Sequence, residues 1–239
     1  MKLANSLHRI GNDIVAVYLV DSPEGVTVID AGLPGHWKDL LAEVESMGRT
    51  LGDVRGVILT HGDSDHIGFA ERLRRDHGVP VYVHSADADR AKGAKPPSTA
   101  TPKMKVGPLL GFIGYSLLKN GLSAKHLTEV VEVSEGDTLD LPGAPQIIGM
   151  PGHSPGSIAV WVPAVDTVFV GDALTTRHVL TGATGPAPAP FTDEPEVALA
   201  SLTHLLPTGA TWVLPGHGGP WSGGVAAAVE AVQLAAAGI

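Results

Sequence analysis

Residues 54–66 read VRGVILTHGDSDH, an apolar run that leads directly into a group of side chains able to bind metal ions. The β-branched stretch from Val54 to Leu59 predicts a buried strand that ends just before Thr60. Four potential ligands then fall within six residues: His61, Asp63, Asp65 and His66. Because a strand end is rigid and the loop beyond it can point side chains inward, this segment predicts a metal site.

Three glycine-flanked motifs later in the chain carry the same kinds of side chain, each where a predicted strand gives way to a loop. They are Gly152-His153-Ser154, Gly171-Asp172 and Gly216-His217-Gly218. A single loop histidine is usually solvated, but four such groups at strand ends together predict convergence on metal ions. The chain contains no cysteine, so a transition metal would be bound by histidine and carboxylate groups.

Strands and helices alternate along both halves of the chain. In the first half we predict strands at 14–20, 26–29, 54–59 and 79–83, with helices at 36–47 and 66–77. The second half is predicted to hold strands at 130–133, 146–150, 157–162, 167–170 and 211–214, with helices at 194–206 and 225–236. Two strand-rich halves with accompanying helices predict an α+β fold in which two sheets pack face to face.

Residues 93–125 interrupt this alternation. The segment begins with several prolines and then carries an apolar patch from Val106 to Leu118. We predict that residues 1–239 form a single domain in which this insertion covers the site as a lid. A helix packed on the core is an equal alternative.

The composition excludes several classes of partner. The chain is 44% hydrophobic and 17% charged, with a formal net charge of -9 that no long acidic run concentrates. Because phosphate binding needs clustered lysine and arginine, this balance disfavours nucleic acid. We do not expect the polar amino terminus to act as a signal peptide, and the longest apolar run is too short for a membrane helix. We expect a cytoplasmic protein that acts on a small molecule; the oligomeric state is not predicted.

The order of the motifs resembles the pattern of the metallo-β-lactamase superfamily, HxHxDH followed by His, Asp and His, over nearly the whole chain. The resemblance implies a four-layer αββα sandwich with a two-metal site along one edge. It implies that metal one is bound by His61, Asp63 and His153, metal two by Asp65, His66 and His217, with Asp172 bridging. Asp30, at the end of an early predicted strand, is expected to support the ligand loop by hydrogen bonding.

One ligand departs from the family pattern, because Asp63 stands where the second histidine of HxHxDH is expected. Three carboxylates and a bridging hydroxide would balance the charge of two divalent metals fully, which predicts a weaker Lewis acid. We expect zinc, with iron or manganese as alternatives because a carboxylate is a harder ligand. Metal two is expected to be the tighter site.

The resemblance implies a stand-alone hydrolase similar to glyoxalase II. A hydroxide between the metals would attack an ester, thioester, lactone or amide carbonyl, and Asp65 would orient it and pass its proton to the leaving group. The lactonases of this superfamily place a tyrosine shortly after the bridging aspartate, and none follows Asp172 here. Candidate substrate contacts are His178, Tyr115 and Phe112, the last two for an apolar acyl group.

Three other functions remain open at this point. A carboxylate at position 63 also resembles the flavodiiron proteins, which allows a di-iron redox protein, although we recognise no flavodoxin domain within these 239 residues. A phosphodiesterase or nuclease would use the same two metals, against which stands the acidic composition. The third alternative is a metal-stabilised binding module without catalysis, which the seven intact ligand types disfavour.

Overall fold

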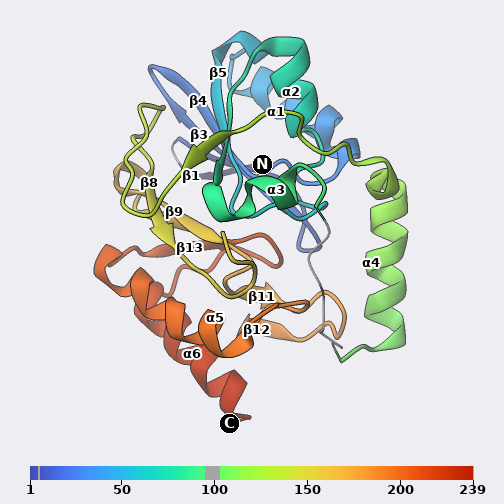
Figure 1. Ribbon diagram of the computed structural model, residues 1–239, viewed down its shortest axis with the longest axis vertical. Helices are drawn as coiled ribbons and strands as arrows, with labels where there is room; N and C mark the ends of the chain where they lie inside the picture. The colour runs from blue at the N-terminus through green and yellow to red at the C-terminus, as the bar shows by residue number, and fades with distance from the viewer. Residues whose placement is uncertain (5, 95–102, 239) are drawn as a thin grey trace.

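Two mixed sheets form the centre of the computed structural model, which describes residues 1–4, 6–94 and 103–238 (Figure 1). The strands of the first sheet, in spatial order, are β1 (Lys2–Ala4), β2 (Leu7–Gly11), β3 (Ala16–Ser22), β4 (Gly25–Ile29), β5 (Val54–Ile58), β6 (Val81–His84) and β7 (Val131–Val133). Strands β1 to β4 pair antiparallel, and β4 to β7 pair parallel. The parallel strands β4 and β5 are rich in valine and isoleucine because both of their faces are covered.

The second sheet has four strands, in the order β13 (Trp212–Pro215), β10 (Thr167–Gly171), β9 (Ile158–Val162) and β8 (Gln146–Gly149). A separate two-stranded ribbon, β11 (Thr175–Arg177) and β12 (Thr184–Ala187), follows β10. Strands β10 and β13 are parallel, so their carboxyl ends open at the same edge of the sheet. That edge carries two of the predicted ligand motifs.

Helices cover the outer face of each sheet (Figure 1). They are α1 (Trp37–Ser46) and α2 (Ala70–His77) on the first sheet, and α5 (Pro195–Ser201), a 3-10 segment (Leu202–Thr208) and α6 (Val225–Ala237) on the second. One apolar cluster joins Val28 to Leu40 beneath the first helices, and another joins Val213 to Val229 beneath the last ones. A third fills the space between the sheets. The predicted α+β fold, a four-layer αββα sandwich, is therefore confirmed.

The sequence-based prediction missed the ribbon of β11 and β12 and was wrong in further details. Strand β7, assigned to the second half, pairs with β6 in the first sheet, and the short strands β1 and β2 were missed. Helix α2 begins at Ala70 rather than at His66. The loop before it bonds to the chain after β4 instead of forming a helical turn, because Ala31 N–H donates to the His66 carbonyl and Gly68 N–H to the Gly32 carbonyl.

The predicted insertion contains helix α4 (Val106–Leu118), which stands at the side of the sandwich (Figure 1). None of its residues is buried, although Phe112 and Tyr115 are half-buried. Whether α4 acts as a lid or as a helix packed on the core stays a prediction. Its ends are fastened to the body: Lys105 N–H donates to the Leu180 carbonyl, and Gly35 N–H donates to the Lys119 carbonyl. Residues 95–102 of the insertion lie outside the described residues. Among the described helices, none is both long and apolar enough to cross a membrane.

Candidate metal centre

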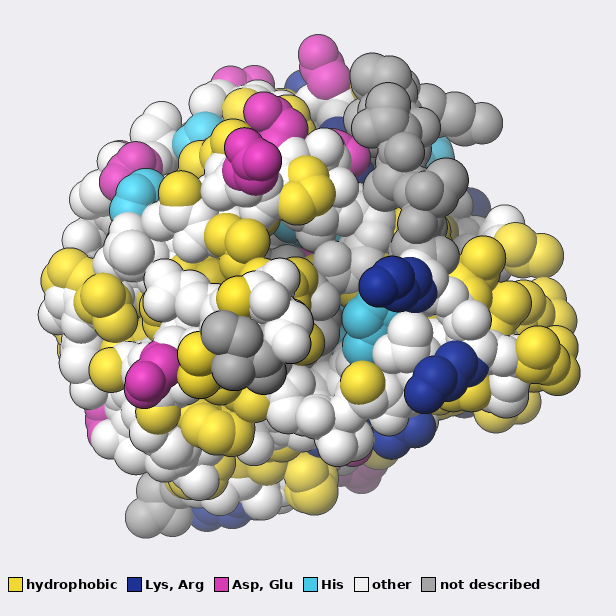
Figure 2. Space-filling view, turned by 90° about the horizontal axis from the view of Figure 1, so that it is seen from below, with side chains coloured by type: hydrophobic (Ala, Val, Ile, Leu, Met, Phe, Trp, Pro, Cys, Tyr) yellow, Lys and Arg dark blue, Asp and Glu magenta, His cyan; other side chains and the backbone are white. Residues whose placement is uncertain are grey.

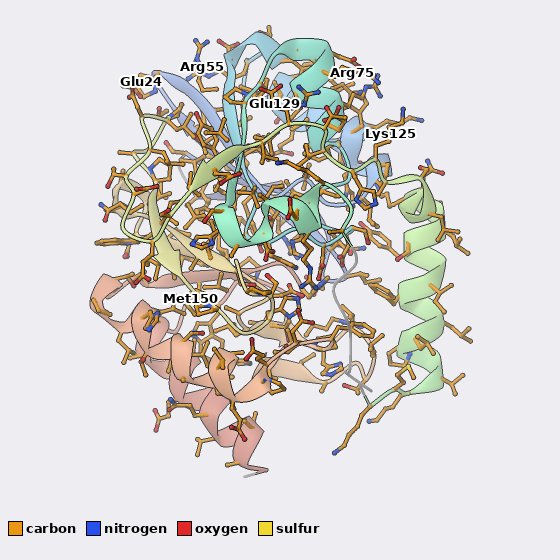
Figure 3. All side chains as sticks on the ribbon, in the orientation of Figure 1. Glu24, Arg55, Arg75, Lys125, Glu129 and Met150 are labelled. Atoms are coloured by element: carbon orange, nitrogen blue, oxygen red, sulfur yellow. The ribbon has the colours of Figure 1, made fainter. Side chains whose placement is uncertain are left out.

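The seven predicted ligands come from four strand ends that meet at one edge of the sandwich. The first loop follows β5, and the others follow β8, β10 and β13. Met150, labelled in Figure 3, belongs to the apolar layer of the second sheet and anchors the β8 end three residues before His153. Rigid strands therefore hold all four ligand segments, as the sequence predicted.

Ligand atoms from these loops form three overlapping groups in which all atoms lie within 4.8 Å of one another. The groups are His61, Asp63 and His153; Asp65, His66 and His217; and His61, His66 and Asp172. The first two groups have the same members as the ligand sets that the family resemblance implied for metals one and two. Asp172 lies between them, with Oδ1 3.6 Å from His66 Nε2 and Oδ2 3.8 Å from His153 Nε2.

All four histidines have Nδ1 against an oxygen, which directs Nε2 toward the centre. The partners are Thr60 Oγ1 for His61, Asp30 Oδ2 for His66, Thr192 Oγ1 for His153 and the Ile14 carbonyl for His217. A hydrogen bond from Nδ1–H fixes the tautomer of a histidine and makes Nε2 a better metal ligand.

Asp30 supports two of these histidines. The buried carboxylate accepts a hydrogen bond from His66 Nδ1, 2.9 Å away, and from the backbone N–H of Thr60 at 2.8 Å. It also accepts the hydroxyl of Thr60, whose oxygen is then free to accept the proton of His61 Nδ1. Asp30 therefore hydrogen-bonds to a ligand histidine and to the backbone of the ligand loop.

Several atoms at the centre are buried without a hydrogen-bond partner among the described residues: His61 Nε2, His66 Nε2 and Asp172 Oδ1. Leaving a buried polar atom unpaired costs about 1–3 kcal/mol. Divalent cations between the ligand groups would remove this cost, so the side chains present fit the metal ions that the motifs implied.

The carboxylates give the centre a strongly negative potential. Burial lowers the pKa of His66, but the adjacent Asp30 carboxylate and then Asp65 and Asp172 raise it to about 10. Burial likewise lowers the pKa of His217, which Asp172 and Asp65 raise to about 9. Burial raises the pKa of Asp172, yet the neighbouring histidines bring it well below its usual range. A centre that holds protons so firmly also attracts divalent cations, which compete with those protons.

Arg90, on the short helix α3 (Ala88–Ala91), contacts the predicted ligand Asp63 and was missed by sequence reasoning. Its Nε donates to Asp63 Oδ1 at 2.5 Å and its Nη2 to Oδ2 at 3.2 Å. Its Nη1 donates to Asp193 Oδ2 at 2.7 Å. Nothing in the sequence near Arg90 indicates this contact, because it depends on where α3 packs.

Sequence reasoning also missed Asp87, which joins the two loops that carry His61 and His153 by hydrogen bonds. Its buried carboxylate accepts the backbone N–H of Gly62 at 2.8 Å and the hydroxyl of Ser154 at 2.7 Å. It also accepts Gly156 N–H at 2.8 Å. The loops that carry His61 and His153 are thereby fixed relative to each other.

A cavity of about 440 Å³ opens beside Asp63 and Asp65. Its apolar lining comes mainly from α4 and the residues that follow it, and includes Leu33, Phe112, Ile113, Leu117, Leu122 and Phe191. Of the predicted substrate contacts, Phe112 lies here. Tyr115 instead has its hydroxyl 2.7 Å from His36 Nε2, and His178 lines a different cavity of about 780 Å³.

Comparison with known proteins agrees with this geometry. The model of the metallo-beta-lactamase superfamily matches residues 10–217, a span that contains every ligand described above. The chain belongs to the metallo-β-lactamase superfamily. Superfamily membership, together with the two groups of ligand atoms, makes it a metal-dependent hydrolase.

Individual superfamily members align along most of this chain. It is 28% identical over 233 residues to the "Probable metallo-hydrolase YflN" of Bacillus subtilis, covering 92% of this chain and 86% of that protein. The crystal structure of TTHA1623 in a di-iron-bound form has a TM-score of 0.65 and 28% identity, covering 95% and 98% of the two chains. A metallo-β-lactamase family protein of Thermus thermophilus, TTHA1429, shares the fold with a TM-score of 0.71 at 20% identity, covering 99% and 80%.

Proposed function

We propose that this protein hydrolyses an ester, thioester, lactone or amide bond in a small molecule that carries an apolar acyl group. The observation that carries the proposal is the cavity that joins the ligands Asp63 and Asp65 to the apolar wall of α4. A carbonyl placed at the ligands would leave its acyl chain against that wall. Burial of a chain there removes apolar surface from water on both sides, at about 25 cal/mol per Å².

The ligands divide the chemistry between them. Two divalent cations, when bound, would supply an acidic water and positive charge for the carbonyl oxygen. Asp65 lines the cavity and has Oδ2 3.4 Å from His217 Nε2, so it faces both the metal centre and the substrate. As the oxygen of water bonds to the carbonyl carbon, the bond to the leaving group breaks, and Asp65 carries the proton of that water to the leaving group.

Zinc is the metal we propose, with iron or manganese as alternatives. The four histidine nitrogens favour zinc, whereas three carboxylates favour harder cations. TTHA1623 has been crystallised with two irons, which supports iron as the first alternative. Metal content of the purified protein by mass spectrometry distinguishes these cases.

The substrate wall of α4 offers a matched pair of variants. Leu117 lines the cavity, whereas its neighbour Leu118 does not and is 76% exposed. Figure 2 shows hydrophobic side chains over the projecting side of the molecule, where α4 lies in Figure 1. Because neither leucine is buried, replacing either one by alanine leaves the core intact.

The test is a series of p-nitrophenyl esters of increasing acyl length, with bis-p-nitrophenyl phosphate alongside. We expect Leu117→Ala to lower kcat/KM for long acyl chains by roughly 3- to 10-fold and Leu118→Ala to leave it unchanged. Equal effects of both variants would remove α4 as the acyl site. Faster cleavage of the phosphodiester than of every ester would replace the proposal by a phosphodiesterase. Oxygen consumption with an electron donor by an iron-loaded protein would replace it by a di-iron redox function.

A further inference from the structure

Asp63 occupies the place of a histidine, and the structure places a fixed arginine behind it. An imidazole is neutral and offers a metal one nitrogen, whereas a carboxylate is charged and offers two oxygens. An aspartate that replaces a histidine ligand therefore needs something to restrict it. The contacts of Arg90 meet this need.

Arg90 contacts the two oxygens of Asp63 unequally. Oδ1 accepts the short hydrogen bond from Arg90 Nε at 2.5 Å, whereas Oδ2 accepts the longer one from Nη2 at 3.2 Å. Oδ2 also lies 3.5 Å from the Nε2 atoms of both His61 and His153, the other ligands implied for metal one. The guanidinium fork therefore turns Oδ1 away from these histidines and leaves the second lone pair of Oδ2 for a metal. It also adds a positive charge that a count of the ligands alone omits.

Arg90 is itself held in place. Gly62 allows α3 to pack directly on the ligand loop, since a Cβ there would lie 2.6 Å from Ala91 N. Asp193 accepts Arg90 Nη1, and its own N–H donates to the carbonyl of His153, another metal-one ligand. The side chain of Arg90 is only 12% exposed. Arg90 thus contacts the ligand Asp63 directly and is linked to the ligand His153 through Asp193.

We propose that Arg90 is a positioning residue that enables Asp63 to serve in place of a histidine, by holding the carboxylate as a one-oxygen ligand of metal one. The proposal depends on the metal site but not on the reaction that the site catalyses. The proposal predicts that zinc binding at the metal-one site requires Arg90 only when residue 63 is aspartate.

Arg90 both orients Asp63 and carries a positive charge, and these two properties predict opposite changes in zinc affinity when Arg90 is replaced. Losing a nearby positive charge would by itself favour a dication, whereas losing the fork leaves Asp63 free to rotate. We expect orientation to dominate, so that Arg90→Gln weakens zinc binding at one site by about 10- to 100-fold, as is typical for groups that orient ligands. Tighter binding would overturn the proposal.

Arg90→Lys separates the fork from the charge. Lysine keeps a positive charge but presents it as a point rather than as a planar fork. We expect Arg90→Lys, like Arg90→Gln, to bind zinc at the metal-one site more weakly than the unmodified protein does. Equal zinc affinity of Arg90→Lys and the unmodified protein would contradict a role for the planar fork. Cobalt(II) absorption of the substituted protein reports ligand number directly, and Arg90→Gln should change the spectrum of one cobalt only.

A double-mutant cycle with Asp63→His tests the conditional need. In Asp63→His alone, the Nδ1–H of the new imidazole would face the Arg90 donors, so zinc affinity should fall. In Asp63→His with Arg90→Gln, the glutamine oxygen can accept that proton, and affinity should recover. Additive effects of the two substitutions on zinc affinity would overturn the proposal.

Two controls distinguish a specific effect of Arg90 on metal binding from misfolding of the variants. Arg74 makes the same forked contact with Glu71, with bonds of 2.9 and 3.0 Å, away from the centre. Arg74→Gln should leave both zinc affinities unchanged. The second zinc of each Arg90 variant is an internal reference, because a misfolded variant would lose both metals; a folded Arg90→Gln protein that loses both equally contradicts a site-one role.

Discussion

Asp30 Oδ2 lies 2.9 Å from His66 Nδ1, and through Thr60 the same carboxylate also orients His61. One buried side chain therefore sets the direction of histidines that belong to different metal groups. Asp30 adopts a positive φ of 62°, a conformation that asparagine also tolerates. An amide replacement consequently changes the hydrogen bonding without straining the backbone.

Asp30→Asn should weaken binding of both metals. The amide carries donors where the carboxylate has an acceptor, so either His66 or Thr60 loses its partner. We expect a loss of about 10- to 100-fold in zinc affinity, measured by competition with a chromophoric chelator. Asp140→Asn, on the exposed loop before β8, is the matched control. Unchanged zinc affinity in Asp30→Asn would contradict the role of this carboxylate in orienting the ligand histidines.

Local patterns were sufficient to predict most of the fold and the ligands. The run from Val54 to His66 contains both a buried strand and its ligands, so its interpretation needs no distant partner. Strand β7 was misplaced because its pairing with β6 crosses the whole insertion, and pairing at that distance leaves no local signal. Arg90 was missed for the same reason, since its contact with Asp63 arises only when α3 packs on the ligand loop.

Removal of the metals should destabilise the protein. Without metal ions, three buried atoms are left without the partners that we propose for them: His61 Nε2, His66 Nε2 and Asp172 Oδ1. A ligand at 1,000 times its Kd contributes about 4 kcal/mol to the free energy of unfolding. Chelation should therefore lower the Tm, and added zinc should restore it. A Tm that does not respond to either treatment would favour a centre that binds no metal in the folded protein.

His36 should make the stability of the protein depend on pH. Burial, and then the charge of Lys119, lower the pKa of His36 to about 4. Its Nδ1 accepts the N–H of Leu33 at 3.0 Å, which requires that nitrogen to be unprotonated. The unfolded chain binds this proton below about pH 6.5, but the folded chain does not until about pH 4.

The sign follows from this difference in bound protons. Stability from His36 is fully present above about pH 6.5 and is lost as the pH falls toward 4, by about 3 kcal/mol in total. Urea unfolding at pH 5 and pH 7 measures the part of this loss that falls between those two pH values, and His36→Asn should reduce it relative to the unmodified protein. The exposed His126→Asn is the substitution control. An equal loss in His36→Asn and in the unmodified protein would assign the pH dependence to other groups.

Gly216 tests how closely the backbone must approach the ligands. A Cβ at this position would lie 2.5 Å from His66 Cε1 and 2.8 Å from Asp172 Oδ1, and both side chains are buried and cannot move aside freely. Gly216→Ala should cost about 1–3 kcal/mol of stability through overpacking and lower the zinc content, because two ligands are displaced. Gly111, within α4, has nothing within 4 Å of its Cβ position. Gly111→Ala should keep both metals and gain up to about 1 kcal/mol from helix propensity. Full zinc content in Gly216→Ala would show that His66 and Asp172 can shift without losing the metals.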